Sequence, residues 1–355
     1  MSDKNLARRT GVQVSFAGVD ITKSIIPYLI SMTYTDQEAD ETDDLQIKLQ
    51  DRAGLWLSDW LDKMIVAAAD SEEVSLAISA VIVRENWKTD GADEVLDCGT
   101  FELDSVTASG PPSEITIKAT ALPFSGSVRQ TKKWRAWEAY TLSRIASEIC
   151  GNAGLSLMYE SASDPYYERA EQFEQSDVEF LAKLCRDAGI SLKTAGSILV
   201  LFDQPTYEAK AETMTITRGD GSYIKYKLDS GSADTQYGAC RCSYVDPETG
   251  QCIEATVTAG EDDKNSDQVL EITRKVSSVA EAQTIAAKQL RLHNKFERTA
   301  TFTLPGNPGL AAGITVMLTD FGGWSGKYMI KTAKHTVSAS GYTTQLTLRR
   351  VLEGY

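Results

Sequence analysis

The sequence predicts an α+β fold, predominantly β, in which two antiparallel β-barrel domains flank a middle helix–strand region. Apolar and polar residues alternate from Gly11 to about Thr120 and again beyond about Glu212, as expected for strands with one buried face. Between these stretches the apolar residues recur at helical spacing. In addition, one strand–turn–strand pattern occurs near both ends of the chain, which indicates two related barrels.

The composition is that of a globular protein, and it limits the partners. The chain has 355 residues, of which 42% are hydrophobic and 24% charged, and its net charge is -14. Such acidity repels phosphate backbones and anionic lipid surfaces, so we expect no specific nucleic-acid binding and no membrane binding. The polar N-terminus lacks a signal peptide, so we expect the protein to remain first in the cytosol. The most apolar run, Val74–Val83, is too short to span a bilayer and predicts a buried strand.

Residues 1–120 are predicted to form the first barrel. Pro and Gly clusters such as "SGPPS" separate the alternating strands, and one short helical piece is expected near "AGLWLSDWLDKM". The segment "DQEADETDD" (Asp36–Asp44) places six acids between two strand patterns. Calcium binding is one interpretation, but the EF-hand order and its glycine are missing, so we favour a solvated hairpin loop.

Residues 121–205 are predicted to form a middle α+β domain of two helix–turn–strand units. The first helix is expected within Trp134–Cys150 and ends before Gly154. The second begins with the capping box of Ser176 and Glu179 and ends at Gly189. Their apolar stripes are Leu142, Ile145, Ala146 and Ile149 in the first helix and Phe180, Leu181, Leu184 and Ala188 in the second.

The second barrel is predicted to combine residues 206–236 with residues 296–355. Residues 237–295 are expected to be an insertion, made of a β-hairpin and a helix, that packs with the middle domain. Near the end of the chain, "SGKYMIKTAKHTVSASG" and "QLTLR" (325–349) resemble "CGTFELDSVTASG" and "ITIKA" (98–119). Both have a glycine, an aromatic residue two positions on, an aliphatic residue four positions on, an S-G turn and a closing strand.

The sequence predicts no catalytic, cofactor-binding or metal-binding residues. Its two histidines, His293 and His335, are isolated, and "GGWSGK" (322–327) lacks the spacing of a nucleophile elbow. The glycine-rich "RGDGS" and "PGNPG" match no phosphate-binding loop and are interpreted as turns. Carboxylate pairs suited to glycoside hydrolysis cannot be recognised among fifty acidic residues.

The cysteines leave one alternative open. The chain has six, without a C-x-x-C pair. Cys240, Cys242 and Cys252 could form a soft-metal or disulfide cluster across the "DPETG" turn. We favour unpaired thiols in a strand pair.

Two segments carry recognisable scaffold motifs. In "FEQSDVEFLAKLCRDAGISL" the motif residues are Ser176, Asp177, Phe180, Leu181, Leu184 and Gly189. In "FTLPGNPGLAAGITVMLTDFGGWSGKYMIKTAKHTVS" they are Pro305, Gly306, Pro308, Leu310 and Gly313. With "GVQVSFAGVDITKSI" and "DLQIKLQDRAGLWLSDW" earlier in the chain, these segments resemble the phage late control D family. That family comprises the central hub proteins of contractile tails and is related to the hub portion of type VI secretion spike proteins.

The resemblance implies a homotrimer whose subunits each contribute two tube-like antiparallel β-barrel domains, so that three chains form a ring of six barrels. It implies a structural, non-enzymatic hub that adapts a threefold spike to a sixfold tail tube and nucleates tube assembly. The partners implied are a tail tube or tube-initiator protein, a trimeric spike, a baseplate wedge or LysM-type adaptor, and a tape-measure protein. No cofactor is implied.

The same resemblance places the protein in the baseplate of a virion or tail-like particle that assembles in the bacterial cytoplasm. DNA or cargo would pass through the channel, which we expect to be lined by carboxylates because the chain is acidic. The chain ends at "TLRRVLEGY", so we expect any needle or cell-wall hydrolase on separate polypeptides.

Two other functions stay open on the sequence. One is a peptidoglycan-degrading or carbohydrate-binding tail component built on the same β-rich frame. The other is a secreted all-β adhesion module, which the missing signal peptide disfavours.

Overall fold

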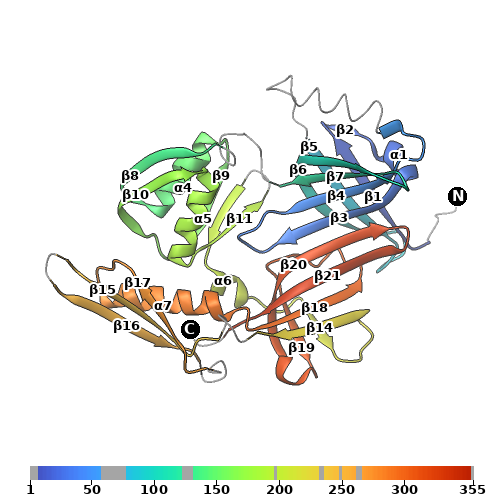
Figure 1. The fold of residues 1–355 in the computed structure, drawn as a ribbon. Coiled ribbons are helices and arrows are strands. Elements are labelled where there is room, and N and C mark those ends of the chain that lie inside the picture. Colours follow the sequence, from blue (N-terminus) through green and yellow to red (C-terminus); the bar gives the residue numbers. More distant parts are fainter. Residues whose placement is uncertain are drawn as a thin grey trace.

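The computed structural model describes residues 7–56, 77–121, 131–195, 198–231, 236–247, 250–260 and 266–352. Within these residues the buried apolar side chains form four clusters, one in each region of the chain. In Figure 1 the two barrels lie on the right, one above the other, with the middle region at upper left and the insertion at lower left. The fold is α+β and predominantly β, with two antiparallel barrels joined to a helix–strand region, as the alternation predicts.

The first barrel follows the predicted period of two. It contains β1 (Arg9–Phe16), β2 (Val19–Asp20), α1 (Thr22–Ile25), η1 (Ile26–Tyr28), β3 (Leu29–Gln37), β4 (Asp44–Gln50), β5 (Ala77–Glu85), β6 (Asp93–Ser109) and β7 (Glu114–Thr120). Its strands neighbour one another in the order β3-β4-β7-β6-β5-β1-β2. Alternate residues of β4 point into the core, as the sequence requires of a sheet with one wet face. Most of the predicted "AGLWLSDWLDKM" helix lies outside the described residues.

The second barrel contains β13 (Met214–Thr217), β14 (Lys225–Ser230), β18 (Arg298–Pro305), β19 (Thr315–Thr319), η4 (Gly322–Trp324), β20 (Gly326–Ser338) and β21 (Gly341–Arg350). The order is β14-β18-β21-β20, with β19 on β20 and β13 on β19. Because β3 of the first barrel also pairs with β20, both barrels belong to one 13-stranded sheet.

The middle region contains β8 (Lys133–Thr141), α4 (Leu142–Asn152), β9 (Ser156–Glu160), β10 (Tyr166–Gln175), α5 (Asp177–Ala188), β11 (Ser191–Ala195), β12 (Ile198–Phe202) and α6 (Gln204–Glu208). The helix expected within residues 134–150 begins only at Leu142, because residues 133–141 form a strand paired with β10. Their exposure alternates, and Trp137 turns inward while Trp134 faces solvent. Both helices are followed by a left-handed glycine, Gly154 at φ 68° and Gly189 at φ 66°, and each chain then enters a strand.

The insertion contains β15 (Ala239–Val245), β16 (Cys252–Thr258), β17 (Val269–Thr273) and α7 (Val279–Asn294). Cys240 and Cys242 are buried in the core that includes α7, whereas Cys252 is exposed, and all three thiols are free. The insertion contacts the middle region through Gln289, whose amide donates to the Arg186 carbonyl at 3.0 Å. How the chain divides into independently folding domains stays a prediction.

Within the described ranges, no helix combines the length and apolar character needed to cross a bilayer.

Candidate functional site at the barrel junction

The two barrels meet where β3 lies against the second half of β20. The first half of β20 pairs with β19, and residues from Thr332 to Ser338 pair with β3 instead. Across this contact the Thr33 and Thr336 hydroxyls lie 3.4 Å apart, and the Tyr34 ring stacks on His335 at 6.1 Å between centroids. The barrels are therefore joined by continuous sheet as well as by the linking chain.

His335 is a structural residue of this junction. Its Nδ1 lies 2.7 Å from the Tyr342 hydroxyl and its Nε2 lies 2.9 Å from the Leu310 carbonyl. The imidazole is fully buried, and burial lowers its pKa. This placement agrees with the interpretation of an isolated histidine as structural.

The acidic β3–β4 hairpin corrects a prediction. It is not a solvated loop, since Asp36, Glu38 and Asp43 are all buried. Its backbone is held on both sides, because the Glu38 N–H donates to Lys331 O and the Asp40 N–H donates to Leu192 O, both at 2.8 Å. The hairpin therefore lies between the second barrel and the middle region, where its carboxylates meet cations.

The strongest of these contacts is made by Arg349 on β21. Its Nε donates to Glu38 Oε2 at 2.8 Å, and Nη2 bonds the second oxygen of the same carboxylate. Its Nη1 donates to Glu208 Oε1 at 2.6 Å, and Arg291 of α7 pairs with the other oxygen of Glu208. Arg349, Glu38 and Glu208 are 1%, 4% and 3% exposed. One buried network thus joins both barrels, the α6 segment and the insertion.

A second set of contacts surrounds Asp36. Lys193 of β11 donates to Asp36 Oδ1 at 2.8 Å and to the Gln37 carbonyl at 2.7 Å. The Ala312 N–H of the second barrel donates to Asp36 Oδ2 at 2.7 Å. Nearby, burial raises the pKa of Asp43 to about 7, although Lys193 opposes the shift. Three regions of the chain therefore share one carboxylate.

Lys295, just after α7, completes the charged core. Burial first, and then the nearby Arg349 cation, lower the pKa of Lys295 to about 8, while Glu38 opposes them. Its ammonium lies 3.3 Å from the Gln204 side-chain oxygen. The cation is thus embedded in the junction rather than presented to a ligand.

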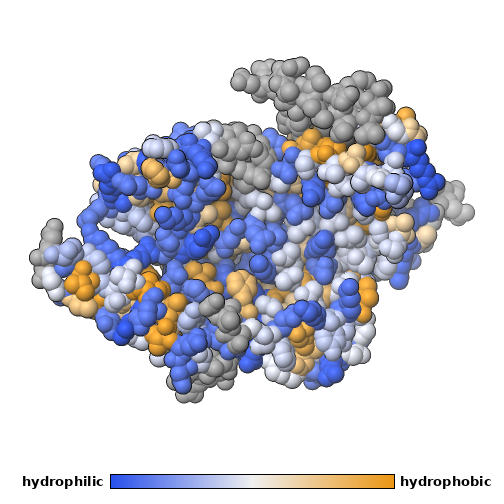
Figure 2. All heavy atoms as spheres, in the orientation of Figure 1, coloured by the Kyte–Doolittle hydropathy of each residue, from blue (hydrophilic) through white to orange (hydrophobic). Residues whose placement is uncertain are grey.

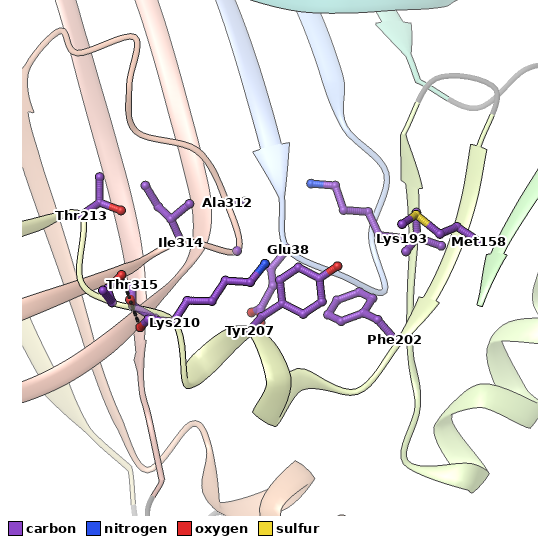
Figure 3. Close-up of a pocket in the computed structure, with 13 residues that line it drawn as sticks. Glu38, Met158, Lys193, Phe202, Tyr207, Lys210, Thr213, Ala312, Ile314 and Thr315 are labelled. Carbon is purple, nitrogen blue, oxygen red and sulfur yellow. Dashed lines mark hydrogen bonds between the residues drawn. The ribbon is translucent and has the colours of Figure 1, made fainter. Parts of the chain in front are cut away.

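A pocket of about 390 Å³ opens beside the network. Figure 3 shows Tyr207 and Lys210 between strands of the second barrel on one side and Phe202, Lys193 and Met158 on the other. The Lys210 ammonium lies 3.9 Å from the centre of the Tyr207 ring. The described residues that line it include neither histidine nor cysteine, and its carboxylate, Glu38, is already paired with Arg349. The arrangement suits a structural joint better than acid–base or nucleophilic chemistry.

The α5 motif residues lie in the middle region. The Ser176 hydroxyl accepts from the Glu179 N–H, and the Glu179 carboxylate accepts from the Ser176 N–H, which makes the capping box. Asp177 is fully buried, with Lys133 Nζ at 2.5 Å and Gln172 Nε2 at 2.9 Å. Phe180, Leu181 and Leu184 lie in the hydrophobic core, and Gly189 faces Lys288 of α7.

The 305–313 turn reaches the junction directly. Gly306 lies under the Tyr342 ring, where an added Cβ would meet ring carbons at 2.1 Å. Pro308 and Leu310 are buried, and the Leu310 carbonyl is the partner of His335. Gly313 has φ 81°, donates to Ile330 O at 2.9 Å and lines the pocket. Pro305 ends β18.

Sequence reasoning found the turn but missed the charged residues that it adjoins. Arg349 carries no local signal, because it lies near the end of a strand in which buried Leu346 and Leu348 alternate with polar residues, and its partner Glu38 lies 311 residues away. Figure 2 shows the outer surface on this face as mostly hydrophilic, with small separate apolar areas.

Comparison with known proteins agrees with this architecture. The sequence model described as "Phage tail baseplate hub (GPD)" matches residues 106–341. A "Probable baseplate hub protein" of Escherichia phage 186 is 26% identical over 235 residues, which are 64% of this chain and 55% of that protein. The chain thus spans about half the length of that curated relative.

Solved structures resemble the chain over a greater length. A 43 kDa tail protein of prophage MuSo2 from Shewanella oneidensis has a TM-score of 0.67 at 14% identity, covering 96% of this chain and 98% of that one. An E. coli component of the type VI secretion system has a TM-score of 0.52 at 11% identity, covering 96% and 78%. At these identities the likeness concerns the fold.

Proposed function

Because the chain belongs to the phage tail baseplate hub (GPD) family, we propose that it is the structural central hub of a contractile tail or injection-system baseplate. In this role it is a homotrimer that adapts a threefold spike to a sixfold tail tube. The observation that carries the proposal is the presence of two barrels with one strand order in one continuous sheet. Three such chains supply six similar rims, which resolves the mismatch between threefold and sixfold symmetry.

The buried junction supports a mechanical role. A hub must keep its two barrels at one fixed angle while the tail contracts. Ion pairs as deeply buried as those of Arg349 contribute little net stability compared with an apolar core, but they favour one arrangement over its competitors. The hairpin contacts on Asp36 add a second constraint on the same angle.

The partners follow from this role. One end of the ring binds the tail tube or tube-initiator protein and nucleates its assembly, and the other holds a trimeric spike. A baseplate wedge or LysM-type adaptor and a tape-measure protein complete the set, and DNA or cargo passes through the channel. The particle is a virion or tail-like baseplate, and assembly takes place in the bacterial cytoplasm.

Light scattering and tube-assembly kinetics test the proposal. The purified chain is expected to reach the mass of three 38.8 kDa subunits, alone or on addition of the trimeric spike. Added to monomeric tube protein from the same genome, it should remove the lag before polymerisation. A chain that stays monomeric with the spike and leaves the lag unchanged contradicts the hub role.

A cell-wall gel assay tests the enzymatic alternative. The structural proposal requires that the purified chain leaves peptidoglycan intact, with a lysozyme lane as the positive control. Clearing by this chain would favour the peptidoglycan-degrading function instead.

A further inference from the structure

We infer that the open edge of β14 in one copy pairs antiparallel with the second half of β6 in the next copy, and that this contact closes the ring. The inference rests on the proposed homotrimer and names the strands and register that build it. Its basis is that the chain already contains one example of the same contact, between β3 and β20.

The two barrels correspond strand by strand. The ladder β3-β4-β7-β6-β5-β1 of the first barrel matches β14-β18-β21-β20-β19-β13 of the second, and both sets follow the same order along the chain. The pairs differ in one respect, since β1 and β5 are antiparallel whereas β13 and β19 are parallel.

The register also corresponds. Phe101 faces Ile78 in the first barrel, and Tyr328 faces Val316 in the second. Two residues farther along each ladder, a positive-φ glycine, Gly99 or Gly326, faces Ala80 or Leu318. Both long strands then carry an irregularity at the same place, between Leu103 and Ser105 in β6 and between Ile330 and Thr332 in β20. A bulge turns a strand, so the second halves of β6 and β20 leave their barrels in the same way.

The second half of β20 uses this exit to accept β3. The strands equivalent to β20 and β3 are β6 and β14. Within the described part of the chain, the second half of β6 pairs only with β7, and β14 pairs only with β18. An unpaired strand edge of this kind is a template for another strand.

Side chains at the β3–β20 contact are buried, whereas their counterparts in β14 and β6 are exposed. Met32 of β3 is 0% exposed, whereas its counterpart in β14, Tyr226, is 41% exposed. His335 of β20 is fully buried, whereas its counterpart in β6, Ala108, is exposed. Pairing of β14 with β6 would bury these exposed side chains, as pairing of β3 with β20 buries Met32 and His335.

The internal contact also fixes the register of the proposed one. Lys334 faces Thr35 within the chain, and the corresponding residues are Thr107 in β6 and Asp229 in β14. One position along, Ala108 then faces Leu228.

The backbone directions agree with this register. The Gly231 N–H donates to Glu297 O, so alternate residues of β14, including Leu228, turn their backbone groups away from β18. The same reasoning applies to β6. The Ala121 N–H donates to Asp43 O, so alternate residues of β7 bond to β4 and the residues between them bond to β6. Followed into β6, this alternation turns the backbone groups of Ala108 away from β7. The proposed register therefore brings outward-facing donors and acceptors opposite one another.

The partner that fits is a second copy of this chain. The contact is heterologous, since β14 and β6 are different strands from different barrels, and such a contact forms a ring when its rotation closes. The angle between neighbouring barrels of the ring is set by the β3–β20 contact, because the contact between subunits would repeat the geometry of that contact.

Disulfide trapping of the full-length chain tests the register. Thr107→Cys and Asp229→Cys are combined after Cys252→Ser removes the exposed native thiol. In the proposed register the N–H and C=O groups of residues 107 and 229 do not bond to each other. Opposite residues of this non-hydrogen-bonded kind have Cα atoms about 4.5 Å apart, which is within disulfide range. Oxidation is expected to give covalent dimers and closed trimers on non-reducing gels, and an equal mixture of the two single variants should stop at dimers.

Two matched pairs serve as controls. Thr35→Cys with Lys334→Cys is the equivalent internal pair and should form a disulfide within one chain. Thr107→Cys with Lys227→Cys keeps the same face but shifts the register, and its linked fraction should be lower by roughly tenfold.

The outcomes separate this inference from the hub proposal. With no reductant present the disulfide-linked product accumulates, so even a sparsely populated interface is detected. A trimer in light scattering without the 107–229 link, or with equal linking of the shifted pair, overturns the strand pairing and leaves the hub proposal standing. A chain that is monomeric with its spike and gives no intermolecular link overturns both.

Discussion

The two barrels share strand order and register but differ in what their edges contact. In the first barrel, β3 is covered by β20, and its residues 32–36 are buried. In the second, the equivalent strand β14 contains the exposed Tyr226 and follows the exposed Ile224. Because the two strands occupy the same place in the same topology, the difference reflects the neighbour and not the strand. The comparison teaches that the β3–β20 contact within one chain is a template for the contact that β14 can make with another copy.

The hairpin tips differ as well. The first barrel connects β3 to β4 by the short acidic loop that lies in the junction, whereas the second connects β14 to β18 through the whole insertion. Arg349 in β21 corresponds to Thr120 in β7, so the buried cation occurs in one of the two barrels. The two barrels thus share their strand order, while the buried cation and the insertion distinguish the second barrel from the first.

Breaking the junction should have the largest effect. Arg349→Met removes the cation that Glu38 and Glu208 share, which leaves the buried Glu38 carboxylate without its ion-pair partner while Glu208 keeps Arg291. We expect a loss of about 3 to 5 kcal/mol in the free energy of unfolding, measured by urea denaturation. Adding Glu38→Leu to this variant should recover part of the loss, because an apolar pair replaces the charged one.

An exposed ion pair provides the control. Arg169 is 60% exposed and pairs with Glu171 at 2.7 Å, so Arg169→Met should cost less than about 1 kcal/mol. If Arg349→Met costs no more than Arg169→Met, the junction does not hold the barrels together.

The helix–strand repeat allows a second comparison of equivalent positions. Gly154 and Gly189 have nearly the same positive φ, but an added Cβ at Gly154 meets nothing within 4 Å, whereas at Gly189 it would lie 2.5 Å from Lys288 Cβ. Gly154→Ala should cost about 1 kcal/mol from backbone strain alone. Gly189→Ala should cost roughly 1 to 3 kcal/mol more, because α7 must move.

Urea denaturation of the two alanine variants measures this difference. Lys288 cannot easily swing aside, since its ammonium donates to Ser163 Oγ at 2.7 Å. Equal costs at the two glycines would show that α7 does not pack closely on the end of α5.

These comparisons also show how much the sequence could predict. Alternation such as that of Leu45, Ile47 and Leu49 predicted the barrels. The capping-box spacing predicted where α5 begins, and glycines predicted where α4 and α5 end, because these signals are local. The strand β8 was missed because Trp134, Trp137 and Tyr140 are spaced three residues apart, which fits a helix and not a period of two. The acidic hairpin was misjudged because burial of Glu38 depends on Arg349, and no local pattern reports a partner so distant.

The smallest effect should come from the aromatic residue that the barrels share. Tyr328 corresponds to Phe101, and both are buried, but the Tyr328 hydroxyl has no hydrogen-bond partner among the described residues. Burial raises the pKa of Tyr328 to about 12, consistent with a phenol held out of water. Tyr328→Phe removes an unsatisfied polar atom and makes the second barrel resemble the first, so we expect a gain of about 0.5 to 1 kcal/mol in unfolding free energy.

Tyr342→Phe is the matched control, since its hydroxyl lies 2.7 Å from His335 Nδ1 and its removal should cost about 1 kcal/mol. If both substitutions destabilise equally in thermal or urea unfolding, the Tyr328 hydroxyl has a partner in solution, and the cores of the two barrels differ at the position where their strands otherwise agree.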